Sequence, residues 1–240
     1  MKIIEKIIAK KNDREGAPAP TIVCLGDSVT EGCFECYMKT DTDIETVFDR
    51  KSSYSARLFE LLSFLYPTVP VNVVNAGVSG TCASEGVRTL ARDVLSHNPD
   101  LVVVSYGLND AYGRLDYLPS YKNALRTIFE QVKEAGAEII FLTENYMCTE
   151  VSPHLQSEVM RKLAGELAAV QKDGVLCAYF EAAKQLAREY GVRVCDLYRV
   201  WEQMEKAGVD TTALLSNHLN HPLREYHHYV ACKLYETMLG

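Results

Sequence analysis

The sequence lacks any apolar run that approaches the roughly 20 residues needed to cross a bilayer. It also lacks an excess of positive charge, because 32 Asp and Glu outnumber 25 Lys and Arg and give a formal net charge of −7. Phosphate binding needs clustered Lys and Arg, so an acidic chain is a poor candidate for nucleic-acid binding. We therefore expect no membrane span and no nucleic-acid partner.

We also expect no secretory signal. Glu5 and Lys6 interrupt what would be the apolar core of a signal peptide. We therefore expect a cytoplasmic protein whose eight cysteines are free thiols. The apolar positions 3, 4, 7 and 8 share one helical face and predict a short amphipathic helix. This helix would pack on the domain or form a dimer contact, and the sequence leaves the oligomeric state open. Its apolar face is short for a membrane-surface anchor.

The chain has no internal repeats, and its only proline-rich segment is the linker at 17–20. We divide it into an N-terminal helix and linker at 1–19 and a single domain at 20–240. Cys33 and Cys36 form a lone C-x-x-C pair, and a zinc site would need more ligands, for which only His218 and His221 are late candidates. We expect no metal and no other cofactor.

What the sequence does contain is an alternation of apolar, β-branched runs with amphipathic stretches. Strands that are apolar on nearly every residue predict a parallel sheet covered on both faces, hence a three-layer α/β/α fold. Five strands suggest a flavodoxin-like sheet in the order 2-1-3-4-5, which would place a site at the carboxyl ends of the strands. The expected strands are 21–25, 71–75, 101–106, 138–143 and 192–196; the expected helices are 53–66, 83–97, 117–135, 154–190 (a break near 172–174 allows two), 197–207 and 223–239.

Polar and glycine-containing motifs follow three consecutive predicted strands, and a fourth lies near the C-terminus. They are Gly26-Asp27-Ser28, Asn75 with Gly80, Gly107-Leu108-Asn109, and His221-Pro222. Taken alone, each has a plainer interpretation as a helix cap, a glycine turn, an Asn-Asp turn or a surface histidine. Together they would put a nucleophile, hydrogen-bond donors and a base at one end of one sheet.

These four segments resemble the blocks that define the SGNH, or GDSL-type, hydrolases, over essentially the whole domain from Thr21 to about Leu239. The resemblance implies a carboxylic ester hydrolase that forms an acyl-enzyme. Ser28 would be the nucleophile and His221 its base, and the oxyanion would be held by Ser28 and Gly80 N–H groups and the Asn109 amide. No cofactor is implied.

The sequence departs from that family at one position. The family usually has Asp three residues before the catalytic histidine, and here that residue is His218. Loss of the carboxylate is costly in other triads. The group that orients His221 could be His218 itself, a carboxylate from Asp210 or Asp196, or a backbone carbonyl or Asn217, which would leave a Ser–His dyad. A poor enzyme is a further outcome.

The substrate is less defined by the sequence. Acidic residues in the long loop after Ser28 would repel phospholipid head groups or acyl-CoA and favour neutral esters, although they could simply face water. We expect a short-chain ester such as a carbohydrate O-acetyl group. Alternatives are a lysophospholipase or thioesterase, a catalytically weak acyl-sugar-binding protein, and a flavin or phosphate binder, which the acidic first loop disfavours. Candidate substrate-lining residues are Asp27, Phe34, Tyr37, Tyr112, Tyr146 and Met147.

Overall fold

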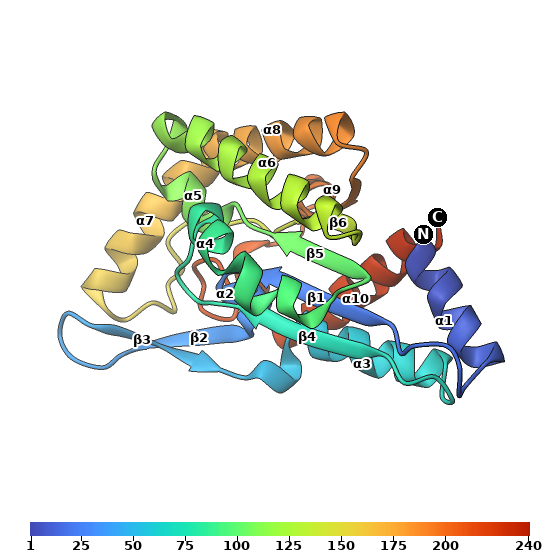
Figure 1. Ribbon diagram of the computed structural model, residues 1–240. Helices are drawn as coiled ribbons and strands as arrows, with labels where there is room; N and C mark the ends of the chain where they lie inside the picture. The colour runs from blue at the N-terminus through green and yellow to red at the C-terminus, as the bar shows by residue number, and fades with distance from the viewer.

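The computed structural model describes residues 1–240 and has a five-stranded parallel sheet at its centre (Figure 1). The strands are β1 (Thr21–Gly26), β4 (Asn72–Gly77), β5 (Leu101–Ser105), β6 (Glu138–Thr143) and β7 (Arg193–Asp196). Their spatial order is β4-β1-β5-β6-β7, and each neighbouring pair is parallel. This confirms the predicted fold class and the order 2-1-3-4-5.

Helices cover both faces of this sheet (Figure 1). Helices α4 (Ala83–Asp93), α6 (Leu118–Glu134), α7 (Glu158–Lys172) and α8 (Val175–Glu189) share one apolar cluster with the sheet. Helices α1 (Lys2–Asn12), α3 (Tyr54–Leu65) and α10 (Arg224–Leu239) share a second cluster, and α9 (Leu197–Lys206) follows β7. The stretch 154–190, for which the sequence allowed two helices, contains two. Gly174 lies between them with φ 72°, a left-handed conformation that interrupts the helix. Short 3-10 turns span Arg50–Ser52, Leu95–His97, Leu115–Tyr117 and Thr212–Leu214.

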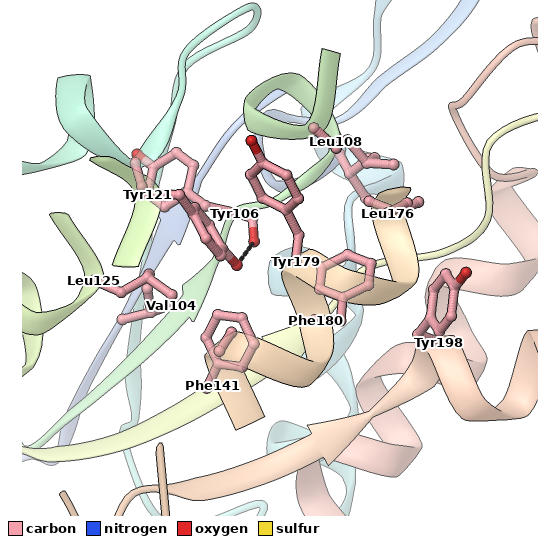
Figure 2. Packing of buried hydrophobic residues seen from close by; sticks show 14 of the residues in the cluster. Val104, Tyr106, Leu108, Tyr121, Leu125, Phe141, Leu176, Tyr179, Phe180 and Tyr198 are labelled. Atoms are coloured by element: carbon pink, nitrogen blue, oxygen red, sulfur yellow. Dashed lines mark hydrogen bonds between the residues drawn. The ribbon is translucent and has the colours of Figure 1, made fainter. Parts of the chain in front are cut away.

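Alternation along the strands explains why two cores form. In β1, Val23 and Leu25 belong to one cluster, whereas Ile22 and Cys24 belong to the other. Successive side chains of a strand point to opposite faces, so an apolar residue at every position requires cover on both. Figure 2 shows the first cluster, where the Tyr121 hydroxyl donates to the Tyr106 carbonyl at 2.8 Å and ties α6 to the end of β5.

The N-terminal helix packs on the rest of this chain. Ile3 and Ile7 are fully buried and join the cluster formed with α3 and α10, while Ile8 is exposed. The Met1 ammonium donates to the Met238 carbonyl at 3.2 Å, which brings the two termini together (Figure 1). Of the two packing modes that the amphipathic pattern allowed, the structure shows packing on the domain.

The segment after Ser28 differs from the expectation of a long loop. It forms an antiparallel hairpin of β2 (Cys33–Met38) and β3 (Ile44–Phe48), which lies beside the main sheet as a separate two-stranded ribbon (Figure 1). Two short helices, α2 (Ser28–Glu31) and α5 (Leu108–Tyr112), were also not predicted. None of the helices combines the length and apolar character that a bilayer span requires.

Candidate active site

The four sequence motifs meet at the carboxyl edge of the sheet. Ser28 begins α2 directly after β1, Asn109 lies in α5 after β5, and His221 lies shortly before α10. Ser28 Oγ is 3.0 Å from His221 Nε2, although 193 positions separate the two residues. A hydroxyl and an imidazole at this distance have the geometry of a nucleophile and its base.

The turn that presents Ser28 is fixed by its neighbours. Asp27 caps α2 by accepting a hydrogen bond from the Val29 N–H at 3.0 Å. The Asn75 amide donates to the Thr30 carbonyl at 2.8 Å and thereby holds the end of the same helix. A Cβ on Gly77 would lie 2.4 Å from the Glu31 nitrogen, so only glycine lets β4 approach α2 this closely.

The hydrogen bonds of His221 define its tautomer. Its Nδ1 lies 2.9 Å from the Phe34 carbonyl oxygen, which can only accept, so Nδ1 carries the proton. Nε2 therefore has a free lone pair and accepts from the Ser28 hydroxyl. Burial lowers the pKa of His221 to about 4, while the Phe34 carbonyl and the Glu35 charge act in the opposite direction. At neutral pH the ring is consequently an uncharged base.

None of the four side chains proposed to orient His221 hydrogen-bonds to its ring, whose two partners are the Phe34 carbonyl and the Ser28 hydroxyl. Asn217 instead shapes the loop, since its Oδ1 accepts from the N–H groups of Leu219, Asn220 and His221 at 3.0 Å each. The His218 ring stacks on His154 with 5.2 Å between centroids. Asp210 accepts from the Ala213 N–H at 3.0 Å, and Asp196 from Lys184 Nζ at 2.8 Å.

The orienting carbonyl of Phe34 belongs to β2, and Arg224 fastens this end of the hairpin to α10. The guanidinium lies over the Phe34 ring at 4.2 Å from its centroid. It donates to both carboxylate oxygens of Glu35, one of them at 2.9 Å, and to Asp49 Oδ2 at 3.0 Å. The partner of His221 Nδ1 is therefore a main-chain carbonyl, at a strand end that Arg224 holds through Phe34, Glu35 and Asp49.

Three of the motif residues carry hydrogen-bond donors suited to an oxyanion. Ser28 is the first residue of α2, so its N–H has no acceptor within that helix. Gly80 has φ 77° and its N–H makes no hydrogen bond. The Asn109 amide donates to the Thr81 carbonyl at 2.9 Å and to Asp27 Oδ2 at 3.2 Å. Both of its hydrogens are thus engaged, and donation to a substrate requires one of these bonds to be shared or exchanged.

Two buried carboxyls beside this site were missed by the sequence analysis. Glu144 follows β6, and its Oε2 accepts from the Leu108 N–H at 2.9 Å. Asp110 accepts from the Ala83 N–H at 3.1 Å, and burial raises its pKa to about 7. An acidic residue directly after an apolar strand was the available signal for Glu144, but no motif distinguished it from an ordinary loop residue.

The proposed lining residues fall into two groups. Tyr37 lines a cavity of about 500 Å³, and Tyr112 lines one of about 340 Å³ together with Asn109. The other four candidates are buried and line neither of these cavities: they are Asp27, Phe34, Tyr146 and Met147. Ser28 and His221 are buried as well, so a role for these four residues at the substrate remains a prediction.

Features that would suggest a different kind of site are weaker. A cavity of about 650 Å³ between β7, α9 and α10 includes none of the four motif residues. No three His, Cys, Asp or Glu side chains gather in a way that could hold a metal ion. Cys33 and Cys36 both lie in β2, where Cys36 Sγ is 3.6 Å from Thr46 Oγ1. The Ser28–His221 pair is therefore the candidate centre.

The chain resembles known proteins in sequence and in fold. The chain is 27% identical over 135 residues to an acetylxylan esterase from Geobacillus stearothermophilus, and the match spans 52% of this chain but only 60% of that relative. The crystal structure of Axe2, an acetylxylan esterase from Geobacillus stearothermophilus, superposes with a TM-score of 0.68 at 22% identity, covering 91% of this chain and 94% of that one. The acetyl xylan esterase AlAXEase gives 0.65 at 16% identity, covering 90% and 98%. Residues 24–227 match the GDSL-like Lipase/Acylhydrolase family, and the chain therefore belongs to it.

Proposed function

We propose that the chain is a serine ester hydrolase that works through an acyl-enzyme. The observation that carries the proposal is the 3.0 Å contact between Ser28 Oγ and His221 Nε2, made by a ring whose other nitrogen is held by the Phe34 carbonyl. This arrangement selects the tautomer that can take the serine proton.

The reaction follows from these contacts. Ser28 Oγ attacks the ester carbonyl carbon as its proton passes to His221 Nε2. The negative oxygen of the tetrahedral intermediate faces the N–H groups of Ser28 and Gly80 and the amide of Asn109, which exchanges its bond to Thr81. His221 then protonates the departing alcohol. A water molecule, activated by the same ring, attacks the acyl-enzyme and releases the acid.

The group that orients His221, which is a carboxylate in a Ser–His–Asp triad, is here a main-chain carbonyl. Structures of Axe2 include mutants described as catalytic at a serine, an aspartate and a histidine, with the last two three residues apart. In this chain the residue three before His221 is His218, which does not touch the ring. The Phe34 carbonyl orients the imidazole in its place, and the nearby Glu35 charge favours the imidazolium that forms during the reaction. We therefore propose a Ser–His dyad supported by a main-chain carbonyl.

We further propose that the substrates are short esters, in particular acetyl groups on carbohydrates. The names of the relatives support this, and so does the small opening: Ser28 and His221 are 4% and 5% exposed. The acidic residues after Ser28 support it less than the sequence indicated. Glu31, Glu35 and Glu45 pair with Arg50, Arg224 and Lys39, which leaves only Asp41 and Asp43 of these residues without an ion pair to repel a phosphate head group.

The test is hydrolysis of p-nitrophenyl esters from acetate to dodecanoate, beside acetate release from acetylated xylo-oligosaccharides. Wild type is expected to favour acetate, and Ser28→Ala to lose activity. Ser96→Ala, which changes an exposed serine outside the motifs, is the matched control. A preference for long acyl chains would point to a lysophospholipase or thioesterase. Binding of acetylated sugars without turnover would identify a catalytically weak binding protein and refute hydrolysis.

A further inference from the structure

Two buried carboxyls, Asp27 after β1 and Glu144 after β6, lie within hydrogen-bonding reach of each other. Each is also tied to α5, Asp27 through the Asn109 amide and Glu144 through the Leu108 N–H, and neither has a basic partner. Glu144 Oε1 is buried and has no donor directed at it. Two carboxylates cannot meet in this way unless a proton lies between them, because like charges in a buried site repel strongly.

The remaining contacts decide which oxygen carries that proton. Asp27 accepts from two donors, the Val29 N–H at 3.0 Å and the Asn109 amide at 3.2 Å, and both favour its charged form. Glu144 accepts one such bond, from the Leu108 N–H at 2.9 Å, and that bond uses Oε2. A hydroxyl at Glu144 Oε1 that donates to Asp27 satisfies every polar atom of the pair.

We propose that Glu144 is a positioning residue that acts as a neutral acid: its Oε1–H donates to Asp27, which in turn holds the Asn109 amide at the oxyanion site. The effect on catalysis rests on the proposed function, whereas the shared proton does not. Asp27 is thereby kept from rotating, and the Asn109 hydrogen that points to it stays engaged while the other becomes available to the substrate.

Glu144 also fixes the short helix that carries Asn109. Helix α5 has five residues, and its first N–H, that of Leu108, donates to Glu144. The Leu108 side chain is buried in the cluster shown in Figure 2. On the same helix, Asp110 ties α5 to the start of α4 through Ala83. Loss of the Glu144 side chain would leave the Leu108 N–H without its acceptor and would remove from Asp27 the proposed donor, while the Val29 and Asn109 bonds to Asp27 remain.

The electrostatic surroundings agree with a protonated pair. Burial raises the pKa of Glu144 well above its ordinary value, and the Asp27 charge raises it further. Burial also raises the pKa of Asp27. The ionisable groups whose pKa responds to the charge of the pair are all acids: they are Asp110 from α5, Tyr54 from α3, Tyr106 after β5, Tyr121 from α6, Cys82 before α4 and Cys33 from β2.

The kinetic test compares Glu144→Ala with Glu144→Gln. Alanine removes both hydrogen bonds, and kcat should fall by about 10²-fold with little change in KM, as when one oxyanion donor is lost. Glutamine can donate to Asp27 and accept from Leu108, so it should restore most of the turnover. A Gln variant as slow as the Ala variant would show that Glu144 acts as an anion and would overturn the proposal.

The matched control is Glu138, at the opposite end of β6, whose carboxylate accepts from the Ile3 N–H at 2.9 Å. Glu138→Ala and Glu138→Gln should leave kcat unchanged, and circular dichroism should show that all four variants are folded. A fall in kcat in the Glu138 variants equal to that in Glu144→Ala would show that the loss in Glu144→Ala is general destabilisation, and would overturn the proposal.

A second measurement does not depend on esterase activity. The infrared difference spectrum of wild type minus Glu144→Gln at neutral pH should contain the C=O stretch of a protonated buried carboxyl, whereas wild type minus Glu138→Gln should not. Asp110, whose pKa burial raises to about 7, contributes to every one of these spectra and cancels in the differences. Absence of the band from the first difference would overturn the shared proton. If the band is present and the protein hydrolyses no ester, the proposed function fails and the carboxyl pair stands.

Discussion

The pH dependence of hydrolysis tests whether His221 works without a carboxylate. Burial lowers the pKa of this ring from 6.5 to about 4, which corresponds to about 3 kcal/mol against the imidazolium. The neutral form is the active base, so activity is lost as pH falls through the folded-state pKa. We expect kcat/KM to stay level from pH 7 to about pH 5 and to decline below about pH 4.

A base with an ordinary pKa would behave differently. With a midpoint of 6.5, kcat/KM at pH 5 would already be about thirtyfold below its plateau. The assay is the initial rate of p-nitrophenyl acetate hydrolysis at low substrate concentration, with p-nitrophenol quantified by liquid chromatography. Circular dichroism at each pH separates titration from acid unfolding.

His218→Asp is the informative variant for this experiment. If the Phe34 carbonyl is the only partner of Nδ1, a carboxylate at position 218 should not change the pH at which kcat/KM declines, here called the acid limb. A wild-type midpoint near 6.5, or a limb that moves upward in His218→Asp, would show that a negative side chain reaches the ring and would refute this account of the site.

Two further predictions concern the packing around the site. Arg224→Ala frees the end of the hairpin and should lower kcat by about 10- to 10²-fold with KM little affected, since small displacements of a catalytic group are costly. Arg224→Lys keeps the charge without the bidentate contact to Glu35 and should recover part of the lost kcat. An unchanged kcat in Arg224→Ala would refute the role of Arg224 in holding the hairpin. Ile7→Ala should lower the free energy of unfolding by about 2–5 kcal/mol in urea denaturation, because Ile7 is fully buried. Ile8→Ala, at an exposed position of the same helix, is the control, and equal effects would show that α1 does not pack as described.

The sheet was predictable because its strands are apolar on nearly every residue. Alternating burial on the two faces of β1, β5 and β6 leaves few other arrangements, and the order of strands follows from the usual connections. The hairpin was not predictable in the same way. Residues of β2 and β3 are mostly half-buried and mix Glu, Cys, Tyr and Thr, so neither a continuous apolar run nor a clean alternation marks them.

Within the site, the sequence identified the residues that carry motifs and missed those that support them. Ser28, Asn109 and His221 were found because each follows a recognisable pattern. Glu144 has no such pattern, and its importance depends on a hydrogen bond to Asp27 that only the fold creates. Position relative to a strand end also does not give the direction of a side chain, so the sequence could not show that Phe34 and Tyr146 are buried.

The Phe34 carbonyl has a consequence for how such chains are sorted. Every amino acid supplies a carbonyl, so no replacement at position 34 deletes this group, and only a displaced backbone removes it. A survey that requires an acidic residue shortly before the histidine would count this chain among inactive relatives. The carbonyl oxygen that orients His221 is common to all residue types, so only the three-dimensional structure can identify it.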